Sequence, residues 1–448
     1  MTSTLDRRVS LRPAPGASPA RGPAPAAGVR ARVAAGPASA RRAVTGPVPA
    51  AGPARPGRTT PLPSGVASLQ LSTKAAALVL RTARVSGPVF RDDTAAQTGL
   101  SISTVNRQVS ALLKAGLIRE RADLTPPGAV GRPRVPFEIN TGDFLTVGIH
   151  IGYRTTSITT HDLQHRVVGA INIPTPQAAT PEQVVAAIGA SARRFADRWV
   201  GKRLLWGGVA IGGRVGAKGT VDHPRLGWQS VPVGELVAQA LGLPVSVASH
   251  VEAMAAAELV VNPAESSQNF LYFYAREMAG IAFSVDGTVH TPAAGPPTIG
   301  HFPTGETRLL DPDKTGRLED AVGDSGVLRA AAAAGLDVDS LEALRREART
   351  GNSIAHDILA ERAEVLGRTV ALISDIFNPD HVILGGQAFT DYPEALPVVS
   401  KALRATSVIN NRDVRVARSA ITVQQKAAGA VALDAVYADP LDALSHTS

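Results

Sequence analysis

The chain has 448 residues, of which 44% are hydrophobic, carries a net charge of +8 and contains no cysteine. This length allows two or three domains with a sizeable core, and the lack of cysteine excludes disulfides and thiolate metal sites. No apolar run reaches the roughly 18 residues of a membrane span, and the first residues lack the apolar core of a signal peptide, so we expect a cytoplasmic protein with no membrane partner.

Positive charge is concentrated in the first third of the chain. Residues 1–70 hold ten arginines and one acidic residue, and residues 71–140 hold ten basic and five acidic residues. The rest holds 26 basic and 32 acidic residues and is net negative. We therefore expect the N-terminal third to meet a polyanion and the remainder not to.

Residues 1–70 form a basic tail rich in Ala, Pro and Arg, with stretches such as PAPGASPARGPAPAAGVRARVAAGPASARR. The stretch has no helical or strand period and too few large apolar residues to close a core, which predicts disorder. Two interpretations stay open. The tail is either an electrostatic arm that adds sequence-independent attraction to DNA, or a solvated segment without a specific role.

Residues 71–140 have the pattern of a winged helix-turn-helix DNA-binding domain. STKAAALVLRTARV predicts a first helix, VFRDDTAAQTG a second that Gly99 closes, and SISTVNRQVSALLKAG a third that Gly116 closes. In the third helix Val105, Val109 and Leu112 form a buried stripe, and polar residues take the opposite face. The residues expected to contact DNA from this helix are Ser103, Thr104, Asn106, Arg107 and Ser110.

The segment GLIRERADLTPPGAVGRPRVPFEIN predicts two short strands around a cationic turn, which is the wing. Arg132 and Arg134 at its tip are expected to contact the phosphate backbone or the minor groove. A three-helix packing unit without a DNA role is the alternative interpretation.

Residues 141–448 alternate between strands and helices. FLTVGIHIGY, TSITTHDL and RVVGAINIP predict consecutive strands, and a later strand pair, NFLYFYAREMAGIAFSVDG, begins a second half. Two β-rich halves that each begin with a hairpin predict a two-lobed α/β body with a cleft between the lobes.

With these motifs in order, the chain resembles the ROK family of repressors, open reading frames and kinases. The resemblance covers residues 73–437 and rests on the winged helix with GRPR, then GIHIGYRT, PRLGWQSVPVGELVAQALGLPVSVASHVEAMAAAE, TIGHFPTG and NPDHVILGG. It implies an actin-like, ribonuclease H-like, ATPase-type fold. It also implies a sugar kinase or a sugar-responsive repressor, and assembly as a homodimer or homotetramer. The winged helix belongs to the repressor branch.

The residues that serve phosphoryl transfer in the family kinases are replaced in this chain. Their Asp-x-Gly-x-Thr hairpin is His150, Gly152 and Arg154 here, and their catalytic Asn-Asp pair is Ser249-His250. Magnesium prefers hard oxygen ligands, and phosphoryl transfer to a hydroxyl needs a carboxylate base. We therefore expect no sugar kinase activity and no catalytic residue.

The resemblance also implies a zinc site, but the sequence does not support one. The family's Gly-His pair survives as Gly300-His301, whereas Leu310, Pro312 and Arg317 stand where the family has thiolates. One histidine does not make a four-ligand site, so we expect no metal and no cofactor.

Six positions correspond to sugar-facing residues of the family, although several differ in type. The candidate ligand-binding residues are Trp228, Ser249, His250, Thr298, His301 and Glu319. For His301 and Glu319 a hydrogen-bonded pair that only holds the loop is the competing interpretation. His150 and Arg154 either form a solvated polar face or recognise an acidic ligand.

The sequence thus predicts a DNA-binding transcriptional regulator that binds double-stranded DNA, forms a homo-oligomer and responds to a sugar-like metabolite. Two alternatives remain: a sugar kinase with unconventional site residues, and a regulator that senses no effector.

Overall fold

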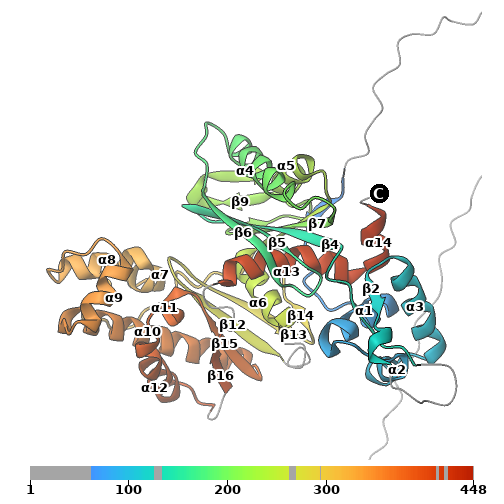
Figure 1. Ribbon diagram of the computed structural model, residues 1–448. Coiled ribbons are helices and arrows are strands. Elements are labelled where there is room, and N and C mark those ends of the chain that lie inside the picture. The colour runs from blue at the N-terminus through green and yellow to red at the C-terminus, as the bar shows by residue number, and fades with distance from the viewer. Residues whose placement is uncertain are drawn as a thin grey trace, which may run out of the picture. The chain divides into compact units, whose positions relative to one another are not determined.

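The computed structural model describes residues 62–125, 134–261, 269–292, 294–409, 413–417 and 422–446 (Figure 1). The predicted basic tail lies outside the described residues as far as residue 61. Its last part is not a tail, because β1 (Ser64–Val66) pairs in parallel with β11 (Val245–Ser249) at a sheet edge. Leu69, just after β1, is buried in a hydrophobic core. The predicted boundary at residue 70 is therefore wrong, and ordered structure begins several residues earlier.

The winged helix-turn-helix has the three predicted helices: α1 (Ala75–Ser86), α2 (Arg91–Thr98) and α3 (Ile102–Lys114). Gly99 ends α2 in the left-handed conformation, with φ of 71°, which a residue without a Cβ adopts at little cost. β2 (Ile118–Glu120) pairs with β3 (Phe137–Ile139), and η1 (Ala122–Leu124) follows β2. Residues 126–133, which include the predicted wing tip, lie outside the described residues.

The first lobe of the body, lobe 1, is built on a six-stranded mixed sheet with strand order β1-β11-β7-β4-β5-β6. Its remaining strands are β4 (Phe144–Ile151), β5 (Thr155–His161), β6 (Val167–Pro174) and β7 (Arg203–Ile211). Helices α4 (Pro181–Ala196) and α5 (Val233–Leu241) cover one face, and α13 (Val423–Ala438) covers the other (Figure 1). A small sheet of β8 (Arg214–Val215), β9 (Val221–His223) and β10 (Trp228–Val231) adjoins it, with η2 (Pro224–Leu226) between β9 and β10.

Helix α13 lies unusually close to the lobe 1 sheet. A Cβ at Gly208 would collide with the backbone of Ala432, and one at Gly148 would lie 2.9 Å from the backbone nitrogen of Gly429. These glycines allow the backbones of helix and sheet to touch, which ties the C-terminal helix to the central strands.

The second lobe, lobe 2, has a five-stranded sheet of order β14-β13-β12-β15-β16, in which β12, β15 and β16 are parallel. Its strands are β12 (Phe270–Ala275), β13 (Ala279–Val285), β14 (Thr288–Val289), β15 (His381–Gly385) and β16 (Asp413–Val416). Its helices are α7 (Leu318–Val322), α8 (Asp324–Ala333), α9 (Leu341–Arg349), α10 (Ser353–Phe377), α11 (Gln387–Thr390) and α12 (Leu396–Thr406), with η4 (Pro393–Ala395) before α12.

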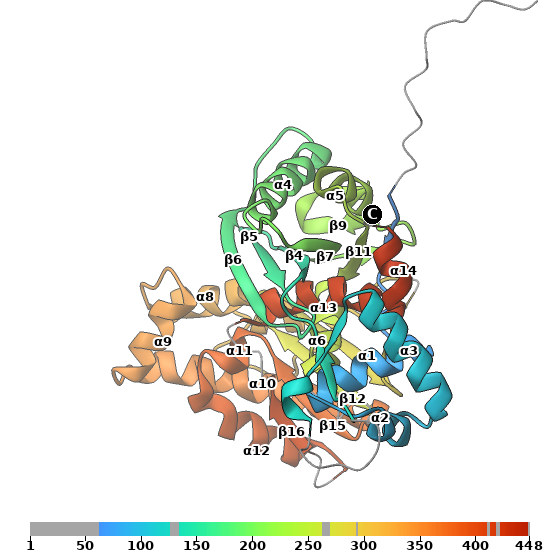
Figure 2. The same cartoon turned by 45° about the vertical axis from the view of Figure 1, so that its right-hand side comes forward.

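Both lobes combine an antiparallel hairpin with parallel strands, and α6 (His250–Val261) packs with α13 between the two sheets (Figure 2). This is the two-lobed, actin-like α/β body that the sequence predicts. No helix in the described part of the chain is long and apolar enough to cross a membrane.

The winged helix and the body share one hydrophobic core. Val105 and Leu112 of α3 belong to the same buried cluster as Leu433 of α13 and Leu444 of α14 (Pro440–Ser445). The ion pair of 2.6 Å between Lys74 Nζ and Asp439 Oδ2 lies at the same junction. The DNA-binding domain is therefore packed against the C-terminal helices and is not joined to the body by a free linker.

Candidate functional site

The exposed face of α3 carries the residues predicted to contact DNA. Ser103, Asn106, Arg107 and Ser110 are all exposed, while the buried stripe of the same helix faces the core. Thr104 is only partly exposed, and its hydroxyl lies 2.9 Å from the hydroxyl of Ser101. The structure thus brings the predicted polar residues together on one helix surface.

The N-terminus of α3 is fixed by its predicted cap. The hydroxyl oxygen of Ser101 accepts a hydrogen bond of 3.2 Å from the backbone N–H of Thr104, which satisfies one of the unpaired donors of the first turn. The Ser103 hydroxyl lies 2.9 Å from the same oxygen. The cap holds the first turn of α3, which carries the predicted DNA-contacting residues, in a defined geometry.

Of the two wing arginines, only Arg134 lies within the described residues; Arg132 does not. The guanidinium of Arg134 forms an ion pair of 2.7 Å with Asp92 of α2 and lies 5.1 Å from the ring centre of Phe90. Both charged side chains are more than half exposed, so this pair is weak and exchangeable. The pair holds the guanidinium of Arg134 against α2.

Between the lobes, the structure brings together the two histidines that stand in place of the family's carboxylates. His150 lies on β4, and His250 is the first residue of α6, directly after β11. Their ring centroids are 6.2 Å apart, and the ring of Tyr274 lies 5.4 Å from that of His250. Within the described residues, His150 Nδ1 and His250 Nε2 are buried and have no hydrogen-bond partner.

Both histidines are neutral near pH 7. Burial, with smaller effects from the charges of His250 and Arg276, lowers the pKa of His150 to about 3. Burial, with His223 and Arg276, lowers the pKa of His250 to about 4. Neutral imidazoles can exchange hydrogen bonds with a polar ligand, but they supply neither the carboxylate oxygens that magnesium prefers nor a base matched to neutral pH.

The other candidates from the first lobe are divided between core and surface. Trp228 is 4% exposed and packs in the core of lobe 1, which favours a structural role, and Ser249 is buried at the end of β11. Arg154 is exposed at the turn between β4 and β5, where Gly152 donates a backbone hydrogen bond to Thr155.

The candidates from the second lobe lie around residues 298–319. Thr298 and His301 are exposed, and Glu319 is partly buried beside Gly300, whose carbonyl accepts its backbone N–H at 2.9 Å. A carboxylate oxygen of Glu319 lies 4.0 Å from Arg225 of η2. Glu319 therefore pairs with an arginine of the other lobe, and the structure does not place it in the hydrogen-bonded pair with His301 that the competing interpretation required.

Two carboxylates hold the loop that corresponds to the family's zinc loop. Asp311 accepts backbone hydrogen bonds from Thr315 at 3.0 Å and from Gly316 at 2.7 Å. Glu361 of α10, which is 4% exposed, accepts the backbone N–H groups of Leu309 at 2.8 Å and Leu310 at 3.1 Å. No group of three or more histidines and carboxylates among the described residues is placed to hold a metal ion.

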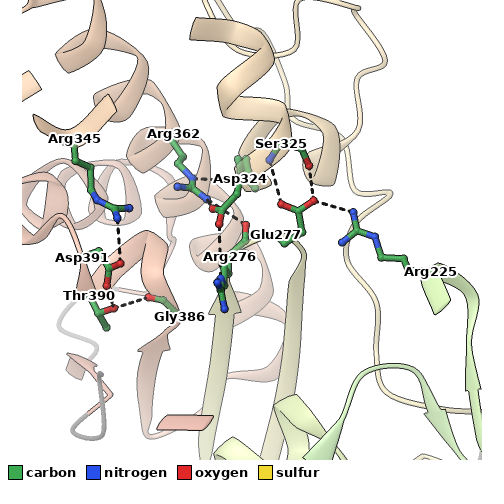
Figure 3. Close-up of polar contacts among 11 residues, drawn as sticks. Arg225, Arg276, Glu277, Asp324, Ser325, Arg345, Arg362, Gly386, Thr390 and Asp391 are labelled. Carbon is green, nitrogen blue, oxygen red and sulfur yellow. Dashed lines mark hydrogen bonds and ion pairs between the residues drawn. The ribbon is translucent and has the colours of Figure 1, made fainter. Parts of the chain in front are cut away.

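A polar network that sequence reasoning missed connects the two lobes (Figure 3). Arg225 donates a hydrogen bond of 3.0 Å to Glu277, in the turn between β12 and β13, and Glu277 also accepts hydrogen bonds from Ser325 of α8. Beside it, Arg362 of α10, which is almost completely buried, forms an ion pair of 2.7 Å with Asp324. The only sequence signal was that Arg225 lies inside the quoted motif PRLGWQSVPVG.

Comparison with known proteins agrees with this geometry. The ROK family model matches residues 146–435, and a model described as winged helix-turn-helix DNA-binding matches residues 91–119, which span α2 and α3. The chain is 50% identical over 396 residues to the transcriptional regulator Rv0485 of Mycobacterium tuberculosis, covering 85% of this chain and 90% of that protein.

Two proteins with lower sequence identity are also similar to this chain. The DNA-binding transcriptional dual regulator NagC of Escherichia coli is 22% identical over 349 residues, which cover 74% of this chain and 85% of NagC. The crystal structure of a ROK family transcriptional regulator, a homologue of the Escherichia coli Mlc protein, has the same fold, with a TM-score of 0.71 at 20% identity over 84% of this chain and 98% of that one. The chain therefore belongs to the ROK family and carries the winged helix-turn-helix of a DNA-binding transcriptional regulator.

Proposed function

We propose that this ROK-type transcriptional regulator reads operator DNA through α3 and does not phosphorylate sugars. The observation that carries the proposal is the combination of an exposed polar face on α3 with His150 and His250 in place of the kinase carboxylates. The first feature suits base readout, and the second removes the groups needed to manage magnesium and a sugar hydroxyl.

On DNA, Ser103, Asn106 and Arg107 would present hydrogen-bonding groups to base edges in the major groove. Arg132 and Arg134 would hold the adjacent backbone or minor groove, Arg134 after release from Asp92. We propose a cytoplasmic homodimer or homotetramer, in which two winged helices read an inverted repeat.

The region between the lobes would bind a sugar-like effector without converting it. A relative in Escherichia coli is named N-acetylglucosamine repressor, which supports a sugar as the class of ligand. Ser249, His250, Thr298, His301 and Glu319 are the proposed contacts. An effector that prefers one arrangement of the lobes over the other would change the geometry of the winged helices, because α13 packs on both lobe 1 and the winged helix.

Selection of bound fragments from genomic DNA, followed by gel-shift titration against a scrambled competitor, tests the DNA assignment. A coupled ATP assay with hexoses and amino sugars tests the absence of kinase activity. Turnover of ATP that a His250→Ala substitution abolishes would overturn the proposal in favour of a kinase with unconventional residues. A metabolite screen in which no sugar raises the melting temperature would favour a regulator without an effector.

A further inference from the structure

A cavity lies at the junction between the DNA-binding domain and the body. It is lined by α1 of the winged helix, by α6 and α13 of the body, and by the segment from Leu69 to Ser72 that follows β1. Its volume is about 40 Å³, which is room for roughly three water molecules. The wall is mainly apolar and includes Leu259 of α6 and Leu433 of α13.

Two arginines of α1, Arg81 and Arg84, also line this cavity. Arg81 donates a hydrogen bond of 3.3 Å to the backbone carbonyl of Ser72. Arg84 donates a hydrogen bond of 2.7 Å to the carbonyl of Val260, its guanidinium lies 5.1 Å from the ring centre of Tyr437, and its Nε is buried without a partner among the described residues. Neither arginine forms an ion pair with a carboxylate of the described residues.

The one acidic group in the wall does not neutralise the two arginines. Asp434 of α13 turns to the chain segment after β1 and accepts hydrogen bonds from the backbone N–H of Ser68 and of Leu69, both at 3.1 Å, and from the Ser68 hydroxyl at 2.9 Å. Burial and the nearby charge of Arg84 lower the pKa of Arg81, as expected for a cation with no carboxylate partner among the described residues. Arg81 and Arg84 are both partly buried, and neither is paired with a carboxylate of the described residues, so the wall presents two cations to which an anion could bind.

We propose that this cavity binds a small carboxylate with a short hydrocarbon chain, with Arg81 and Arg84 as the partners of the carboxylate group. The planar guanidinium matches a carboxylate. The apolar side chains of the wall can contact the hydrocarbon chain. This site lies apart from the region between the lobes, shares no residue with the sugar-facing set, and is contributed jointly by the DNA-binding domain and the body.

The position of the site gives its ligand a route to the DNA-binding domain. Arg84 binds the carbonyl at the last turn of α6, and α6 begins at His250. A ligand that takes hydrogen bonds from Arg84 would change the contact between α1 and α6, because Arg84 donates to the carbonyl of Val260. It would thereby bias how the winged helix packs on the body.

Butyrate is the probe for the test, used on the full chain by isothermal titration and thermal melting. We expect butyrate to bind and to raise the melting temperature, and the neutral isostere butyramide to do neither. Arg81→Met should weaken butyrate binding at least about tenfold, because it removes a charge-assisted hydrogen bond. Arg404→Met, an exposed arginine in the last turn of α12, is the matched control and should bind like the wild type.

A second variant keeps both arginines and fills the cavity. Ala256→Leu, on the α6 wall, should abolish butyrate binding while Arg81 and Arg84 remain. Butyrate that fails to bind the wild type at millimolar concentration overturns the proposal, and so does equal binding of butyrate and butyramide. If a folded Arg81→Met protein binds butyrate as the wild type does, butyrate binds at another site, and the proposal is also overturned.

Discussion

Arg225 of lobe 1 donates a hydrogen bond of 3.0 Å to Glu277 of lobe 2, and this ion pair joins the two lobes directly (Figure 3). Arg225 lies in η2 and Glu277 in the turn between β12 and β13, so neither residue is a neighbour of the other in sequence. Both side chains are close to 40% exposed. The pair therefore connects the lobes without locking them together.

Substitution of Arg225 and substitution of Glu277 should lower the free energy of unfolding by different amounts. Arg225→Met removes an exposed ion pair and should lower the free energy of unfolding by less than about 1 kcal/mol. Glu277→Gln should cost more, because Glu277 also accepts hydrogen bonds from the backbone N–H and hydroxyl of Ser325 at the start of α8. Urea unfolding of both single variants and the double variant measures the difference. Equal losses in the two single variants would contradict this assignment.

For DNA reading, Arg107→Ala should weaken operator binding by about 1–3 kcal/mol and leave binding to unrelated DNA less affected, because base contacts specify sequence. Fluorescence anisotropy with operator and scrambled duplexes at one salt concentration gives both affinities. Arg194→Ala, an exposed arginine of α4, removes the same charge far from α3 in sequence and serves as the control. A uniform loss on both duplexes would assign Arg107 to the phosphate backbone.

The N-terminal arginines should act differently from Arg107. Residues 1–61 hold ten arginines and one acidic residue, and their deletion leaves β1 intact. We expect the deletion to weaken operator and scrambled DNA alike and to flatten the dependence of affinity on salt, because counterion release scales with the phosphates neutralised. A full-length variant with these arginines changed to glutamine separates charge from length. An unchanged salt slope would make the segment a tail without a role in DNA binding.

The local sequence pattern predicts those elements whose structure is set by residues close to one another in the chain. The stripe of Val105, Val109 and Leu112 and the cap at Ser101 were enough to predict α3. The proximity of His150 and His250 was predictable only through the resemblance to the ROK family, since they lie 100 residues apart in the sequence. The fold and the loss of the kinase carboxylates could thus be inferred before the structure.

The features that the sequence does not predict depend on contacts between residues far apart in the chain. The sequence around β1 has no strand period and few large apolar residues, so it predicts a tail there. The strand forms through its pairing with β11, which lies far away in the sequence. Arg225, Glu277 and Glu361 look like ordinary surface charges along the sequence. Their partners lie 52 residues or more away for Arg225 and 51 or more for Glu361, so only the folded chain identifies them.

Stability should fall in mild acid because buried histidines resist protonation. His150 is 5% exposed and burial lowers its pKa to about 3, whereas an unfolded histidine titrates near 6.5. The unfolded chain therefore takes up a proton that the folded chain does not. The resulting stabilisation is present above pH 6.5 and is lost as the pH falls toward 3. The free energy of unfolding should thus decrease between pH 6.5 and pH 5.

The variant His150→Gln isolates this contribution. It should reduce the dependence of the free energy of unfolding on pH by up to about 1.4 kcal/mol per pH unit in the same window. Urea unfolding at pH 7.5, 6.5 and 5.5 measures the slope, and His356→Gln, an exposed position on α10, is the control. A slope identical to that of the wild type would mean that His150 takes up its proton in the folded chain.

The loop at residues 304–317 should depend on carboxylates and not on a metal. Glu361 accepts the backbone N–H groups of Leu309 and Leu310 from a nearly inaccessible position. Glu361→Gln keeps the shape of the side chain but removes its charge and one acceptor, and should lower the free energy of unfolding by about 1–3 kcal/mol. Glu364→Gln, on the same helix but half exposed and paired with Arg368, should cost less than about 1 kcal/mol.

Chelation separates this carboxylate-held loop from a metal-held one. Since Asp311 and Glu361 already supply the acceptors that order the loop, EDTA should leave the melting temperature of the wild type unchanged. A chelator-induced drop that added zinc reverses would assign a metal to this loop. The two measurements are independent, because Glu361→Gln tests the hydrogen bonds and EDTA tests the ion. Together they decide which of the two holds residues 304–317 beside His301 and Glu319.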